Sequence, residues 1–267
     1  MEESRAEAQN EDQPADERED EIEIAHGRGF NPDFYSHPGG SIRPSVAPHT
    51  VRFKFTFTNH IGVAVTFDLF GTLVRAPKPT DPARAIATEL DARGVDVPED
   101  WAEAYRTPQI DAPDGSEIPL PAHVGRALSA CGVKVPGNAA RRAVIAAFDP
   151  EVETREGAVE AIEAAREYGP VGVLSNCSVP ELVGKTLIRA EFSREFDAVV
   201  SSVGCGWRKP HPKAFEAVAA ELEVSVEEII HVGDSSEADA GIEACGGRAV
   251  LLNGVALADV PALLGEP

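Results

Sequence analysis

Lysine is scarce in this sequence, which holds 6 Lys against 18 Arg, and acids outnumber bases 45 to 24. The resulting formal net charge of -21 argues against nucleic acid and anionic membranes as partners, because both would be repelled. A large negative charge with little lysine is typical of proteins that stay soluble in concentrated salt. We therefore expect a halophilic source, with an ordinary acidic protein as the alternative.

Long apolar runs and paired cysteines are also missing. No stretch of 18 apolar residues occurs, so no transmembrane helix is expected. The N-terminus lacks the basic start and the apolar stretch of a secretion signal. The cysteines form no CxxC pair, which argues against a zinc site, so we expect a cytoplasmic protein with free thiols. The four cysteines are Cys131, Cys177, Cys205 and Cys245.

The first 60 residues differ in composition from the rest of the chain. Residues 1–24 hold 11 acids and 2 Arg, and residues 25–50 are rich in Gly, Pro, His and Ser. Such a segment buries too little apolar surface to offset its chain entropy. We expect residues 1–60 to form a disordered acidic leader that is dispensable. One hypothesis is that translation of the native protein begins at Val63 through a GUG codon, because the predicted fold begins there.

Beyond the leader, the apolar pattern alternates between short strands and amphipathic helices. From residue 156 onward this is regular β/α alternation, which implies a parallel sheet with helices on both faces. We predict an α/β fold with a Rossmann-like, doubly wound parallel sheet of about five strands. Strands are expected at residues 63–68, 171–175, 198–202, 229–232 and 249–252, and helices of this part at 156–168, 180–188, 212–222 and 237–244.

The block between residues 80 and 150 interrupts the alternation. It contains four helical patterns and no convincing strand, and it follows the first strand directly. We expect a helical cap inserted after that strand and folded over the edge of the sheet. The predicted core domain comprises residues 61–79 and 151–267, and the predicted cap comprises residues 80–150. Its helices are expected at 82–93, 99–105, 121–130 and 138–148.

Polar side chains lie at or after the ends of four strands, where ligands bind in a doubly wound sheet. The segments read VTFDLFGTLV, VLSNCS, WRKPHPKAF and HVGDSSEAD. Any one of these side chains is equally well explained by helix capping. All four segments in order predict a site with a carboxylate, a hydroxyl, an ammonium and an acid pair. The side chains concerned are Asp68, Thr72, Ser175, Asn176, Lys209, Asp234 and Asp239.

In this order the four segments resemble the four motifs of the haloacid dehalogenase superfamily, over about residues 63–255. The resemblance implies a hydrolase whose helical cap closes the site and helps to select the substrate. It implies that Asp68 is a nucleophile that forms a covalent intermediate, and that Lys209 holds it and neutralises charge. The implied catalytic set is Asp68, Thr72, Ser175, Asn176 and Lys209, and the implied Mg²⁺ ligands are Asp68, the Phe70 carbonyl, Asp234 and Asp239.

Phe70 departs from the pattern, because phosphatases of this superfamily usually carry an acid–base Asp two residues after the nucleophile. An aromatic residue there resembles the 2-haloacid dehalogenase branch, whose halide leaving group needs no proton. Asp234 and Asp239 instead resemble the metal-binding acids of phosphatases, and without a cation their repulsion with Asp68 would be costly. We favour a Mg²⁺-dependent phosphatase acting on a small phosphate monoester. The alternatives are a 2-haloacid dehalogenase and a non-catalytic binding protein.

Several other polar residues are expected to be structural rather than catalytic. Cys177 is expected to be a small buried filler, and His231 a core residue. His123 and Tyr105 of the predicted cap are expected on the surface. For Trp207, both a position that lines the site and a position beside it are considered.

Overall fold

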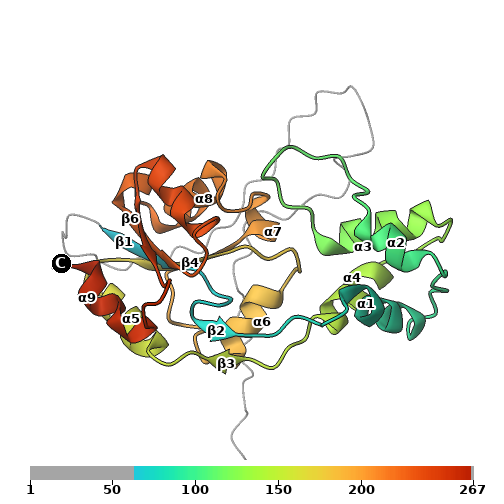
Figure 1. The fold of residues 1–267 in the computed structure, drawn as a ribbon, viewed down its shortest axis with the longest axis horizontal. Helices are drawn as coiled ribbons and strands as arrows, with labels where there is room; N and C mark the ends of the chain where they lie inside the picture. Colours follow the sequence, from blue (N-terminus) through green and yellow to red (C-terminus); the bar gives the residue numbers. More distant parts are fainter. Residues whose placement is uncertain (1–62, 266–267) are drawn as a thin grey trace, which may run out of the picture.

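The computed structural model describes residues 63–265, so the predicted leader of residues 1–60 lies outside the described part of the chain. Five parallel strands form the main sheet in the order β5-β4-β1-β6-β7. Figure 1 labels the three central strands, β4, β1 and β6. This sheet, with helices around it, confirms the predicted α/β fold. The strands are β1 (Ala64–Phe67), β4 (Val171–Ser175), β5 (Ala198–Ser201), β6 (Ile229–Gly233) and β7 (Arg248–Leu251).

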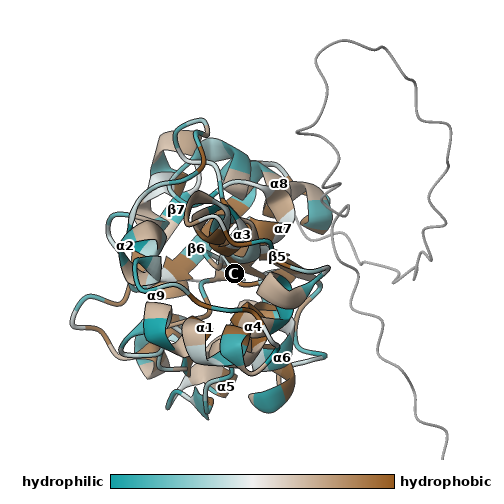
Figure 2. Cartoon of the chain, turned by 90° about the vertical axis from the view of Figure 1, so that its right-hand side faces the viewer, coloured by the Kyte–Doolittle hydropathy of each residue, from teal (hydrophilic) through white to brown (hydrophobic). Residues whose placement is uncertain are grey.

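Alternate side chains of each strand point to opposite faces of the sheet and enter two separate apolar clusters. Val65 and Phe67 belong to one cluster, and Ala64 and Leu174 belong to the other. Figure 2 shows that the helices carry both hydrophobic and hydrophilic residues, as expected of helices with one buried side. Residues of α5 (Ala158–Ala165), α6 (Leu182–Arg189) and α9 (Val260–Leu264) join the first cluster, and residues of α8 (Pro212–Leu222) and the 3₁₀ helix η3 (Asp239–Cys245) join the second.

Four helices between residues 80 and 150 pack on one another and form a group beside the sheet (Figure 1). We call this segment the helical insertion. Its first helix begins where Asp81 accepts a hydrogen bond from the amide of Arg84 at 3.1 Å and a proline follows at the first turn. The indole of Trp101 donates to the Ala83 carbonyl at 2.9 Å and joins two helices. The four are α1 (Pro82–Asp91), α2 (Trp101–Arg106), α3 (Leu120–Ala130) and α4 (Ala139–Ala147).

The two chain segments that connect the sheet to the helical insertion pair with each other. Strand β2 (Val74–Arg75) runs antiparallel to strand β3 (Glu153–Thr154). This two-stranded ribbon was not predicted, because strands of two residues are too short to show alternation. The ribbon brings the return segment against the turn that follows β1.

A long loop of the helical insertion, residues 107–119, also lies on the core. The backbone of Arg208 donates to the Gly115 carbonyl at 2.9 Å, and the amide of Glu117 donates to the Gly206 carbonyl at 2.9 Å. Ser116 and Trp207 form an isolated antiparallel bridge at the same place. This loop therefore attaches the helical insertion to the core in addition to the ribbon.

Some elements differ from the sequence-based expectation. The helix predicted at 237–244 is the 3₁₀ helix η3, in which Gly241 packs so closely on Pro210 that a Cβ would lie 2.4 Å from the proline Cβ. The helix predicted at 156–168 is limited to α5, because Gly157 precedes it with a φ of 84°. None of the described helices is long and apolar enough to cross a membrane. Short elements that were not predicted are α7 (Ser202–Cys205), η2 (Val226–Glu228), η4 (Leu257–Asp259) and α9.

Candidate active site

The predicted site residues meet at the carboxyl ends of the central strands. Asp68 follows β1, Ser175 ends β4, and Asp234 follows β6. Strand β1 lies between β4 and β6, so these three positions are neighbours, at the point where the strand order reverses. Lys209 reaches the same edge from the loop that follows α7.

The Lys209 ammonium lies at the centre of the site and is almost fully buried. Its Nζ lies 2.8 Å from Asp68 Oδ1, 2.7 Å from Asp239 Oδ1 and 2.7 Å from the Leu174 carbonyl oxygen. An ammonium has three N–H donors, and these three acceptors satisfy all of them. Lys209 therefore holds the predicted nucleophile and one member of the acid pair in fixed positions.

Asn176 fixes the backbone of Lys209. The side-chain amide donates to the Lys209 carbonyl at 2.9 Å, and its oxygen accepts from the Lys209 amide at 2.8 Å. Both polar atoms of the Asn176 side chain are used in this way. The side chain is thus a positioning group for Lys209, and only the backbone of Asn176 is left for the predicted contact with a substrate oxygen.

Asp239 lies behind Lys209 and is bound to protein donors on both oxygens. Its Oδ1 contacts Lys209 and, at 3.1 Å, His231 Nε2, while its Oδ2 accepts from the Ser235 amide at 2.9 Å. Burial opposes ionisation, but the His231 hydrogen bond and Lys209 hold the pKa of Asp239 below its usual value. Asp239 is therefore an ionised partner of Lys209, which differs from the expected place among the metal ligands.

His231 is a buried, neutral residue, as a core histidine was expected to be. Burial and the nearby Lys209 charge lower the pKa of His231 to about 4. Because the Asp239 carboxylate can only accept, we assign the imidazole proton to Nε2. Nδ1 is then the acceptor for the Thr66 hydroxyl, 2.8 Å away. The 3.3 Å approach of Lys209 Nζ to Nε2 is consequently a contact and not a hydrogen bond.

Asp68 lies in an environment with excess negative charge. Burial raises the pKa of Asp68 to about 6, the Lys209 charge lowers it, and Asp239 and Asp234 raise it further. The carboxyl is a nucleophile only when ionised, so it needs either a pH above this value or another cation. One ammonium faces three carboxylates here, and Lys209 is already shared between Asp68 and Asp239.

Asp234 lies against the turn that follows Asp68. Thr72, which is fully buried, places its hydroxyl 3.5 Å from Asp234 Oδ1, a long contact. Gly71 has a φ of 95°, and a Cβ on this residue would lie 2.3 Å from Asp234 Oδ2. Only glycine allows both this backbone conformation and this close approach.

Replacing Gly71 with Ala should therefore displace Asp234 and strain the turn. We expect turnover to fall at least about a hundredfold and stability to fall by about 1–3 kcal/mol. Gly94→Ala is a matched control, because Gly94 has a φ of 73° but open space around its Cβ position. Steady-state rates and denaturant unfolding of both variants measure the difference. Equal losses of activity in the two variants would refute the proposed contact.

The donor chemistry of the site suits a magnesium ion. Mg²⁺ is commonly held by one or two carboxylates with waters, and Asp68 and Asp234 are oxygen donors on adjacent loops. In the described chain, no group of three or more His, Cys, Asp or Glu side chains is arranged to hold a metal. The fit rests on two carboxylates, and a carbonyl such as that of Phe70 would complete the protein ligands.

Ser175 is the second polar group that points to a ligand. The residue is 1% exposed, and its Oγ has no hydrogen-bond partner among the described residues. A buried hydroxyl without a partner costs free energy, and an oxygen of a bound substrate would satisfy it. The role of Ser175 in holding a transferring oxygen stays a prediction.

Two further residues support the site and were not predicted, Arg155 and Glu117. Arg155 follows β3 and donates through Nη1 to the carbonyls of Gly71 and Thr72, the second at 3.3 Å. The Glu117 side chain is 3% exposed and accepts from Ser202 Oγ at 2.5 Å and from Arg208 Nη1 at 2.6 Å. Both lie in segments without a periodic pattern, so the sequence carried no signal for them.

The residues set aside in the sequence analysis lie mostly as expected. Cys177 is buried, and burial raises the pKa of its thiol to about 11, as suits a packing role. His123 Nε2 lies 2.6 Å from the Tyr105 carbonyl oxygen, and the two rings meet edge to face within the helical insertion. Both are half-buried and not fully on the surface. Trp207 stacks on His211 with ring centroids 4.2 Å apart.

A parallel α/β sheet with a buried aspartate–lysine pair and further acids at its carboxyl edge is typical of the ligand sites of doubly wound enzymes. The family comparison is more specific: the model described as "Hydrolase: haloacid dehalogenase-like hydrolase" matches residues 63–246. The chain therefore belongs to the haloacid dehalogenase-like hydrolases, as the sequence motifs predicted. No curated protein sequence matches it.

Solved structures show the same fold at low sequence identity. A HAD phosphatase from Thermococcus onnurineus is 20% identical, with a TM-score of 0.50, and the match covers 76% of this chain and 97% of that one. A 2-haloacid dehalogenase from Pseudomonas syringae pv. Tomato DC3000 is 19% identical, with a TM-score of 0.57, and the match covers 76% and 98%. At these identities the likeness supports the fold alone, so it does not choose between the two reactions.

Proposed function

We propose that this hydrolase is a Mg²⁺-dependent phosphatase acting on a small phosphate monoester. The observation that carries the proposal is the position of Asp234, which lies against the turn after Asp68 and whose carboxylate has, among the described residues, a long contact to Thr72 as its one side-chain hydrogen bond. Asp234 raises the pKa of Asp68, and the Lys209 ammonium that lowers this pKa is shared with Asp239. A second carboxylate next to Asp68 suits a metal-dependent phosphatase, because a bound cation would be held by both acids and would offset their repulsion.

In the proposed reaction, Asp68 attacks the phosphorus and the ester P–O bond breaks. The leaving oxygen takes the bonding electrons and a proton from solvent or substrate, because Phe70 cannot donate one. Water then attacks the aspartyl phosphate, which releases phosphate and restores the carboxylate. Bound Mg²⁺ supplies charge neutralisation, and the residues that would hold it are Asp68, Asp234 and the carbonyl of Phe70.

Other residues position the groups that react. Lys209 fixes Asp68 through the 2.8 Å ion pair and contributes positive charge next to an anionic substrate. Ser175 Oγ, with the backbone at Asn176, holds a phosphoryl oxygen in this proposal. The helical insertion serves as the cap that excludes water and selects the substrate.

Chelation is the direct test of the metal. With a chelator in excess, hydrolysis of nitrophenyl phosphate should fall at least about a hundredfold, and Mg²⁺ should restore it.

Because Phe70 offers no proton, nitrophenolate should leave far faster than a sugar alkoxide. A general acid raises the rate of such a step about 10²–10⁴-fold. Phe70→Asp should therefore reduce the difference in rate between the two esters, if the pocket tolerates the change. Equal rates for both esters in the unaltered protein would contradict the role assigned to Phe70.

One observation favours the dehalogenase as the second candidate. Phe70 is half-buried and packs on the main apolar cluster next to Asp68, where it could contact the carbon and halogen atoms of a haloacid. In that case 2-chloropropionate should release chloride in the presence of chelator, while phosphate esters stay intact. This outcome would replace the phosphatase proposal. Turnover of neither substrate class, in high salt, would favour a binding protein.

A further inference from the structure

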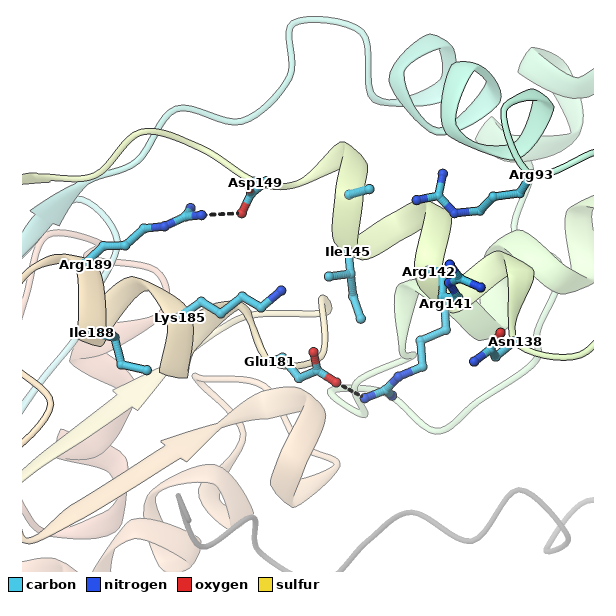
Figure 3. Close-up of a pocket in the computed structure, with 11 residues that line it drawn as sticks. Arg93, Asn138, Arg141, Arg142, Ile145, Asp149, Glu181, Lys185, Ile188 and Arg189 are labelled. Atoms are coloured by element: carbon cyan, nitrogen blue, oxygen red, sulfur yellow. Dashed lines mark hydrogen bonds and ion pairs between the residues drawn. The ribbon is translucent and has the colours of Figure 1, made fainter. Parts of the chain in front are cut away.

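A cleft of about 690 Å³ separates helix α4 of the helical insertion from helix α6 of the core (Figure 3). This volume is within the range of small-molecule sites, which often lie between parts of a protein. The proposed catalytic residues are not among those that line it. The cleft is therefore a separate feature from the site around Asp68.

The charge of this cleft is opposite to that of the chain. Five of the 24 Lys and Arg residues line it, against two acids, in a protein with a net charge of -21. The acids are already paired: Arg141 with Glu181, and Arg189 with Asp149 at 2.8 Å. The five cationic residues are Arg93, Arg141, Arg142, Lys185 and Arg189.

Two of these cations have no ion pair or side-chain hydrogen bond among the described residues, Arg142 on α4 and Lys185 on α6. Figure 3 shows Lys185 extending from α6 toward α4, between the two ion pairs. Ile145 of α4 and Ile188 of α6 also line the cleft, and Ile188 is 50% exposed. An exposed isoleucine beside unpaired cations is a surface that a ligand with an apolar body and negative groups would cover.

We propose that this cleft binds a small organic dianion, with one anionic group on Arg142, the other on Lys185, and an apolar body on Ile145 and Ile188. Each of the two walls carries one of these unpaired cations. A ligand with two anionic groups can contact both cations at once, and a ligand with one anionic group cannot. Because α4 belongs to the helical insertion and α6 to the core, the ligand ties the two together. The proposal is independent of the reaction catalysed at Asp68.

Naphthalene disulfonate is a suitable probe, because it is a dianion with an apolar body and is not a phosphate ester. Calorimetric titration of the whole chain should be done at the lowest salt that keeps it folded, because salt screens such contacts. The disulfonate should bind at least about tenfold more tightly than naphthalene monosulfonate. Arg142→Gln and Lys185→Gln should each weaken its binding about tenfold, or ~1.4 kcal/mol.

Arg126→Gln and Lys134→Gln are matched controls, because both residues are exposed, carry no ion pair among the described residues and lie outside the cleft. Disulfonate affinity in these controls should stay within about twofold of the parent. Comparable weakening in the controls would show that only net charge matters and would overturn the proposal. Equal affinity for the two sulfonates, or no binding, would also overturn it.

Discussion

Replacing Asp68 with Asn is expected to abolish turnover and to leave the fold intact. An amide cannot act as the nucleophile, and loss of a nucleophile typically lowers kcat by about 10⁴-fold or more. The shape of the side chain is kept, and Lys209 retains Asp239 and the Leu174 carbonyl as partners. Steady-state rates with both substrate classes give the measurement. Retention of more than a few per cent of the parent activity would exclude Asp68 as the nucleophile.

The same variant should not lose stability at neutral pH. The pKa of Asp68 is raised to about 6, so the fold favours the protonated carboxyl and the ionised form is unfavourable above that pH. Asn removes this unfavourable charge, and thermal unfolding should occur at the parent temperature or above it. Asp91→Asn, at the exposed end of α1, is the control for a change of charge and should keep full activity.

Replacing Lys209 with Met should reduce both stability and activity. Its ammonium is the shared partner of Asp68 and Asp239, which would be left buried with no cation between them. Removing one partner of a buried ion pair costs about 3–5 kcal/mol. Denaturant unfolding measures this cost, and Lys213→Met, at an exposed lysine over the Trp207 ring, should cost less than about 1 kcal/mol.

A double variant separates the two effects of Lys209. Adding Asp239→Asn to Lys209→Met removes one of the two unpaired carboxylates, so part of the lost stability should return. Turnover should stay lost, because the cation next to the substrate is still missing. Parent-like unfolding of Lys209→Met alone would contradict the central position given to this lysine.

The sequence predicted the main residues of the site because their positions follow from strand order. Asp68, Ser175 and Asp234 each lie at or just after the end of an apolar strand, and parallel strands end at a common edge. The alternation of these strands with amphipathic helices gives an apolar pattern that can be recognised without a structure. The Lys209 contact with Asp68 was expected only through the family resemblance, because no local pattern predicts where a loop lysine reaches.

The parts that were missed depend on contacts between segments that are distant in sequence. The Thr66–His231 hydrogen bond forms because the register of β1 and β6 pairs these two residues. The composition of the strands does not determine this register. The β2–β3 ribbon is too short for any periodicity. Arg155 owes its place to that ribbon, so its contact with the Gly71 turn could not be predicted either.

The contacts of the helical insertion with the core lie close to both members of the Asp68–Lys209 pair. The β2–β3 ribbon adjoins the turn after Asp68, where Arg155 binds the Gly71 carbonyl. The loop that bridges Ser116 and Trp207 adjoins the segment that carries Lys209. A movement of helices α1–α4 relative to the sheet would therefore act on the surroundings of both residues.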